Sequence, residues 1–124
     1  MTPALLRMTA CIEGLTAITL ALAPNIVARL LLGEVLSYPG LAVARLTGIA
    51  LFALTVMAWT GREISGRSPA LAAMLTYNAL AAVYLAALAV ETATAGPLLL
   101  PAALLHAVLG LALLLAWLRA GNED

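Results

Sequence analysis

Four polar side chains stand out because each interrupts a long apolar stretch of the chain. They are Glu13, Arg45, Asn78 and His106. A carboxyl and an imidazole can exchange a proton or bind a ligand, an arginine can neutralise the carboxyl, and an amide can hydrogen-bond between helices. Ionisable residues inside a membrane are energetically costly, and they often mark a binding site or a pathway. If these four residues meet, they form a polar pocket.

The elements that must position them are membrane helices. The chain has 124 residues, of which 65% are hydrophobic and 10% charged, with a mean hydropathy of +1.09. A soluble domain carries about 25% charged residues. Six basic and six acidic side chains cannot cover a water-exposed surface of this size. The formal net charge is zero, so the composition gives no reason to expect a nucleic-acid partner.

Four segments have the length of about 20 apolar residues that a bilayer-spanning helix needs. Thr2-Pro3 and Ser68-Pro69 are typical helix starts, and proline or glycine lies near the other boundaries. The predicted spans cover approximately residues 2–23, 39–60, 69–91 and 97–119. The sequence therefore predicts one all-α domain over residues 1–124, a transmembrane four-helix bundle.

The segment 25–36 is too short to cross a membrane. Asn25, Arg29 and Gly33 recur at a spacing of four, and apolar residues fill the other positions. This pattern predicts a short interfacial helix after the first span, lying on the outer membrane surface. An apolar loop against the bundle is the alternative.

Orientation follows from the arginines, since the chain has no lysine. With four spans, both termini and the 61–68 loop share one side of the membrane. That side has the arginines Arg7, Arg62, Arg67 and Arg119, whereas the opposite side has Arg29. The positive-inside rule predicts that both termini lie in the cytoplasm, and Trp59 and Trp117 at the same helix ends agree with this.

Helix rise allows the depth of each polar residue to be counted. Glu13, Asn78 and His106 fall near the middle of their spans, and Arg45 lies roughly 9 Å from the outer end of its span. Tyr84 lies at nearly the level of Arg45. Residues at one level that avoid lipid must converge, so we expect these side chains to face one interior space. The same count predicts that Glu13 pairs with Arg45.

Each of these residues also has a structural interpretation. Glu13 and Arg45 could only fix helix packing, Asn78 could only join two helices, and His106 could be a hydrogen-bonded core histidine rather than a proton relay. Tyr77 and Tyr84 share one face of the third span and could be packing residues. Haem ligation by the histidine is disfavoured because a second strong axial ligand is absent. The sequence has no recognisable catalytic motif, so we expect no catalytic residue, metal ligand or cofactor.

The segments EGLTAITLALAP, VARLTGIALFAL, MLTYNAL and LLHAVLGL give the chain a likeness to known families. In size, span count and layout it resembles the small four-helix membrane proteins of bacteria described as DoxX-like. That resemblance implies a location in the bacterial inner membrane, and it carries over no functional residue. The chain is also similar in length, span count and the position of Glu13 to small multidrug resistance transporters. It differs from these transporters in three ways: Arg45 could neutralise Glu13, the link after the first span is long, and the pattern of the later spans does not match.

Two classes of function follow from these observations. The first is a non-enzymatic membrane protein that binds or transports a small hydrophobic molecule or protons. Its polar pocket is formed by Glu13, Arg45, Asn78, His106 and the two tyrosines. Four helices are few for a complete transport path, so a homo-oligomer is expected in that case. The alternative is an accessory subunit of a larger membrane complex, with no site of its own. An enzyme acting on a lipid or quinone ranks third.

Overall fold

The computed structural model describes residues 2–91 and 95–121. Within those residues the chain forms five α-helices and one short 3-10 turn, with no β-strand. The elements are α1 (Thr2–Leu22), α2 (Pro24–Leu32), α3 (Tyr38–Thr60), η1 (Gly61–Glu63), α4 (Pro69–Glu91) and α5 (Leu99–Ala120). The prediction of an all-α fold is confirmed.

Helices α1, α3, α4 and α5 are each long and apolar enough to cross a membrane. They correspond to the four predicted spans, with boundaries that differ by one or two residues. The second span begins at Tyr38, because a proline in the first turn needs no backbone N–H partner. The fourth begins at Leu99, after a turn that contains Pro97. Four candidate spans indicate a multi-pass membrane protein.

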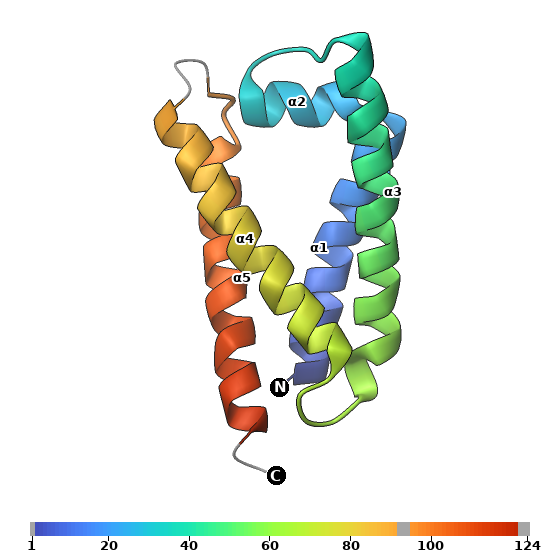
Figure 1. The fold of residues 1–124 in the computed structure, drawn as a ribbon, viewed down its shortest axis with the longest axis vertical. Coiled ribbons are helices and arrows are strands. Elements are labelled where there is room, and N and C mark those ends of the chain that lie inside the picture. Colours follow the sequence, from blue (N-terminus) through green and yellow to red (C-terminus); the bar gives the residue numbers. More distant parts are fainter. Residues whose placement is uncertain (1, 92–94, 122–124) are drawn as a thin grey trace.

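Helix α2 lies across one end of the bundle, crosswise to the long helices (Figure 1). It is shorter than the helix predicted over 25–36, since Gly33 adopts a left-handed conformation with φ of 75° and ends it. Residues 33–37 instead form a return loop to α3. The side chain of Asn25 fastens this loop by accepting a hydrogen bond of 3.0 Å from the backbone N–H of Leu36.

The segment before α5 holds α2 in place. The backbone N–H groups of Gly96 and Leu98 donate to the carbonyl oxygens of Leu31 and Leu30, at 3.0 Å and 2.8 Å. These carbonyls lie at the end of a helix and would otherwise lack partners. A Cβ atom on Gly96 would overlap the backbone of Leu30, so this contact requires glycine.

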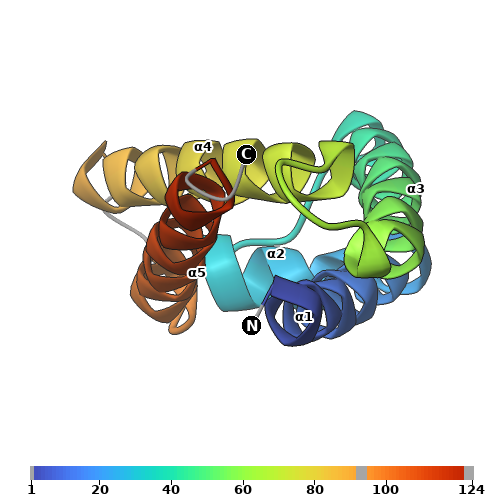
Figure 2. The same ribbon diagram turned by 90° about the horizontal axis from the view of Figure 1, so that it is seen from below.

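The long helices form two close pairs, α1 with α3 and α4 with α5 (Figures 1 and 2). Small residues permit the close approach. A Cβ atom on Gly48 of α3 would lie 2.7 Å from the backbone nitrogen of Ala21 on α1, and one on Gly14 would lie 3.1 Å from the Thr55 side chain. Close backbone contact at small residues is the usual way in which membrane helices associate.

The two pairs pack against each other mainly at the end of the bundle that holds both termini. We call this end the terminal half and the end covered by α2 the α2 half. One cluster of buried residues from all four long helices fills the terminal half. Its members are Leu6, Ala10, Ala58, Ala70, Leu71, Met74, Leu113 and Ala116.

Candidate intramembrane binding site

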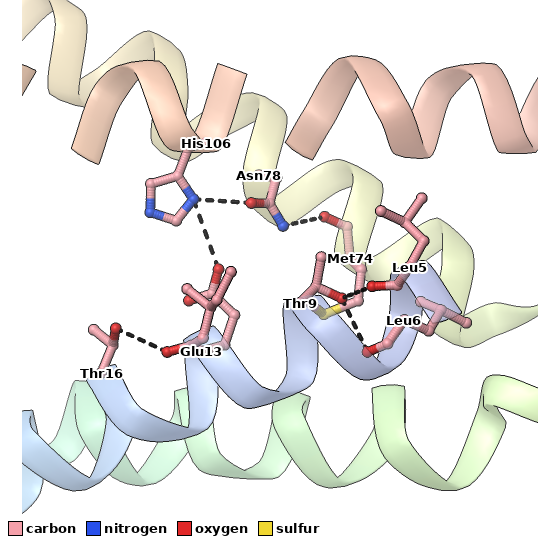
Figure 3. A network of polar contacts seen from close by, with 9 residues as sticks. Leu5, Leu6, Thr9, Glu13, Thr16, Met74, Asn78 and His106 are labelled. Atoms are coloured by element: carbon pink, nitrogen blue, oxygen red, sulfur yellow. Dashed lines mark hydrogen bonds and ion pairs between the residues drawn. The ribbon is translucent and has the colours of Figure 1, made fainter. Parts of the chain in front are cut away.

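Three of the predicted polar residues meet between the two helix pairs. Glu13 on α1 and Asn78 on α4 are buried, with exposures of 1% and 0%, and His106 on α5 is nearly so. The Nδ1 atom of His106 lies 2.9 Å from Oδ1 of Asn78 and 3.7 Å from Oε1 of Glu13 (Figure 3). The structure therefore brings together the three residues that the depth count placed near the middle of the bilayer.

Local helix geometry fixes the amide of Asn78. Its Nδ2 atom donates a hydrogen bond of 2.9 Å to the carbonyl oxygen of Met74, one turn earlier in α4. The amide oxygen must then point away from that carbonyl and toward His106 (Figure 3). Tyr77, the preceding residue, places its ring edge-on to the imidazole, with 5.5 Å between the ring centroids.

The neighbouring threonines of α1 do not supply partners to the carboxyl. The hydroxyl of Thr9 donates to the carbonyls of Leu5 and Leu6, and that of Thr16 donates to the carbonyl of Ile12. The Oε1 atom of Glu13 is buried and has no hydrogen-bond partner among the described residues. Buried polar atoms of this kind are rare, because an unsatisfied group loses its interaction with water and gains nothing in return.

A cavity of about 820 Å³ adjoins this carboxyl and extends through the α2 half. Glu13, Tyr77 and His106 lie in its wall at the inner end. All five α-helices contribute to its apolar lining, which includes Leu20, Leu31, Leu51, Leu54, Leu85 and Leu105. A volume of this order is typical of sites that bind small molecules.

The cavity reaches the outside of the bundle at the level of the bilayer. Four residues of its lining are exposed. Two of them, Thr47 on α3 and Tyr84 on α4, lie on one side, and the other two are Leu15 on α1 and Leu105 on α5. Each of these pairs lies on facing helices of the two helix pairs. Because α2 covers the end of the bundle, the openings are lateral, and in a membrane they would face lipid.

The predicted pair between Glu13 and Arg45 does not form, which corrects the prediction from depth. Arg45 is exposed on α3 and has no ion pair among residues 2–91 and 95–121, whereas the carboxyl of Glu13 lies 3.7 Å from Nδ1 of His106. Depth along a helix does not determine the direction in which a residue faces. The residues at positions 44, 48, 51, 55 and 58 form a buried or half-buried stripe along α3, and two of them, Gly48 and Thr55, lie against α1. At 3.6 residues per turn, Arg45 lies about 100° around α3 from the centre of this stripe.

Tyr84 occupies an intermediate position. It lines the cavity, as its spacing of seven from Tyr77 predicts, but 67% of it is exposed. It therefore lies at the rim of the cavity rather than in the polar network.

Sequence reasoning missed the contribution of α2 to this site. Val27, Leu30 and Leu31 line the end of the cavity, although the segment was expected to lie on the membrane surface. One feature of the sequence could have predicted this contribution. The short helix has an apolar face, and it directly follows the span in which Glu13 is expected to face inward. Thr19 and Thr47 were also missed, because a threonine in a helix usually bonds to its own backbone, as both do here.

Comparisons with known proteins find no match for this chain, whether with protein-family models, curated proteins or solved structures. The likeness to DoxX-like proteins and to small multidrug resistance transporters therefore rests on size and layout. The function must be argued from the cavity and its polar residues.

Proposed function

We propose that this protein binds a small lipophilic molecule within the bilayer, in the cavity between the two helix pairs. The observation that carries the proposal is a cavity of about 820 Å³ whose wall includes a buried carboxyl oxygen that has no hydrogen-bond partner in the part of the chain that the structure describes. The apolar lining suits a hydrocarbon body, and Glu13, Tyr77 and His106 suit one polar group at its inner end. The lateral openings suit a ligand that enters from lipid.

Binding is better supported than proton conduction. A proton path needs ionisable groups or water on both sides of the central pair. The network of Glu13, His106 and Asn78 ends at the carbonyl of Met74, and below it the apolar cluster of the terminal half is closely packed. On that side the buried polar side chains of Thr9 and Ser68 bond to backbone atoms of their own helices. No hydrogen bond among the described residues therefore continues the network toward the terminal end.

The test uses a substitution that places a large side chain in the cavity. Ala102 lines the cavity on α5, and Leu104 on the same helix is 67% exposed. A long-chain fatty alcohol with a photoactivatable diazirine should label the purified wild-type protein in nanodiscs within α1, α2 and α5. Ala102→Phe should reduce this labelling, because its ring occupies part of the cavity, and Leu104→Phe should leave it unchanged. Equal labelling of all three proteins would contradict the proposal.

The proposed location is the bacterial inner membrane, with both termini in the cytoplasm. Arg62 packs over the Trp59 ring at 4.7 Å and Arg67 over the Trp117 ring at 5.2 Å, which places cationic and aromatic side chains at the terminal end of the bundle. This arrangement is typical of a cytoplasmic interface. In a Cys11→Ser background, Ser65→Cys should be protected from an impermeant thiol reagent in intact cells, and Glu34→Cys should react.

An alternative function is that of an accessory subunit of a larger membrane complex, and Arg45 favours it. This residue is exposed within α3, about seven residues from the start of a candidate span. A partner with an acidic residue at that level would neutralise it, whereas in a lone bundle its long side chain must extend to the membrane surface. Native mass spectrometry of the protein taken from its own membranes distinguishes the two. A stoichiometric protein partner that is lost in Arg45→Leu supports the alternative.

A further inference from the structure

The orientation of one amide determines which hydrogen bonds the site can make. The Nδ2 atom of Asn78 donates to the Met74 carbonyl, so the atom that faces His106 is the amide oxygen. Reversing the amide would place two oxygen atoms against each other. The oxygen can only accept, so Nδ1 of His106 must carry the hydrogen.

The other ring nitrogen of His106 is then an acceptor. The neutral imidazole has a single N–H, and its second nitrogen carries a lone pair. The ring's partner at hydrogen-bond distance is a neutral amide, and the nearest Glu13 oxygen is farther away, at 3.7 Å, which favours this neutral form. The Nε2 atom has no partner among the described residues, and it lies on the side of the ring away from Asn78 (Figure 3).

That side is the one toward which the cavity extends. In Figure 3 the free nitrogen of His106 lies toward Thr16, and both residues line the cavity. The polar end of the cavity therefore presents an imidazole lone pair beside the carboxyl of Glu13. Among the described residues, the lining of the cavity includes no arginine or lysine. A head group that only accepts hydrogen bonds would leave the lone pair unsatisfied.

We infer that the ligand is an uncharged lipophilic alcohol or phenol, whose hydroxyl donates a hydrogen bond to Nε2 of His106. This inference rests on the proposed function and specifies the ligand class. An ammonium group could also donate, but bringing a full charge into the bilayer core is costly. An uncharged hydroxyl avoids that cost.

Two matched pairs of compounds test the inference. The first is 4-octylphenol and its methyl ether, and the second is dodecan-1-ol and its methyl ether. In each pair, the ether has a methyl group in place of the hydroxyl hydrogen, so it lacks the hydrogen-bond donor. Binding to the full chain in nanodiscs should be roughly three- to tenfold tighter for the hydroxyl compound, as expected for one neutral hydrogen bond. The pair with the larger ratio shows whether the aryl or the alkyl hydroxyl is the better ligand.

The variant His106→Leu should remove this preference by weakening the hydroxyl compound while the ether binds as before. Asn78→Leu is a second variant, which keeps the imidazole but removes the amide that holds the hydrogen on Nδ1. It should partly reduce the ratio of hydroxyl to ether affinity. Cys11→Ser, at an exposed position outside the cavity, is the matched control and should keep the wild-type ratio.

The tautomer itself can be observed because the chain has one histidine. In protein labelled with ¹⁵N-histidine, Nδ1 should resonate as a protonated nitrogen and Nε2 as an unprotonated one. Adding 4-octylphenol should shift Nε2, and adding the ether should not. A protonated Nε2 in the free protein would overturn the inference.

The outcomes separate the two proposals. If no compound binds, the proposed function fails. If hydroxyl and ether bind equally to the wild-type protein, the cavity binds lipophiles but the inferred donor is wrong. A preference that persists in His106→Leu also overturns the inference, because the hydroxyl is then recognised elsewhere.

Discussion

The terminal half and the α2 half of the bundle are built from the same four helices, but one is packed and the other is hollow. In the terminal half, alanines alternate with large side chains such as Leu71, Met74 and Leu113, all 0% exposed. In the α2 half, the small residues Ala81 and Ala102 line open space instead. At the interface between the two helix pairs, the alanines of the terminal half pack against large side chains, whereas Ala81 and Ala102 of the α2 half do not.

The hollow half needs a separate element to close it. The helices α1 and α3 diverge from α4 and α5 toward α2, and α2 bridges the gap (Figure 1). An unfilled apolar cavity forfeits dispersion contacts along its whole lining. A lipophilic occupant would restore those contacts, so the geometry favours a binding site over an empty defect.

The polar residues lie where the two halves meet. Asn78 is anchored to Met74, a member of the packed cluster, while Glu13 and His106 line the cavity. The packed half thus provides a rigid support for the side chains that the hollow half presents to a ligand.

The largest expected contrast comes from enlarging an alanine in each half. Ala116 is 3% exposed and belongs to the packed cluster, so Ala116→Phe should destabilise the bundle by about 3 kcal/mol, the upper end of the usual cost of overpacking. Ala102→Phe should be neutral or stabilising, because its ring enters the cavity. Unfolding by SDS, followed by circular dichroism, measures both. Equal losses in the two variants would show that the α2 half is as tightly packed as the terminal half.

Shortening a leucine in each half should give a smaller contrast of the same kind. Leu71→Ala should cost about 2 kcal/mol, the low end for a core leucine, because in a membrane the packing contacts are lost without a large transfer term. Leu85→Ala, on the same helix but at the cavity wall, should cost less than about 0.5 kcal/mol because few contacts are removed. The same unfolding assay compares them. A larger loss for Leu85→Ala would reverse the assignment of the halves.

A local effect is expected where α2 is fastened to α5. Gly96→Ala should push the 95–98 segment away from α2 and break the hydrogen bonds to Leu30 and Leu31. Losing a bond worth about 1 kcal/mol should raise amide exchange at Leu98 by roughly fivefold. Global stability should barely change, since the packed cluster is remote. Ala95→Ser is the control, and unchanged exchange in Gly96→Ala would show that the contact does not hold α2.

The sequence predicts the helices of this fold well and the boundaries of the short one less well. Long apolar runs separated by proline and glycine determine the four long helices, because a bilayer requires about 20 apolar residues. The end of α2 depends on Gly33 adopting a positive φ, which the apolar pattern of the segment does not reveal. The position of α2 over the cavity depends on contacts with residues 96 and 98, far away in the sequence.

The sequence predicts how deep each polar residue of the candidate site lies along its helix, but not which way that residue faces. Counting helix rise places Glu13, Asn78 and His106 at one level, and the structure brings them together. The same count misplaced Arg45, because it ignores rotation about the helix axis. The stripe of small residues that includes Ala44 and Gly48 carried that information, since small residues mark the face of α3 that approaches another helix. The cavity itself could not be predicted, because it arises from divergence of the helix pairs.

The smallest expected effect is the coupling between Glu13 and Arg45. Arg45 is exposed on α3 and Glu13 is buried beside His106, so Arg45→Leu should change stability by less than about 0.5 kcal/mol, and its effect should add to that of Glu13→Leu. A parallel cycle with Glu13→Leu and His106→Leu should deviate from additivity by at least about 0.5 kcal/mol, as residues in contact do. Both cycles use SDS unfolding in the same micelles. A coupling above about 1 kcal/mol between Glu13 and Arg45 would mean that the arginine reaches the carboxyl. It would then cross the space assigned to the cavity, and the α2 half could not be hollow.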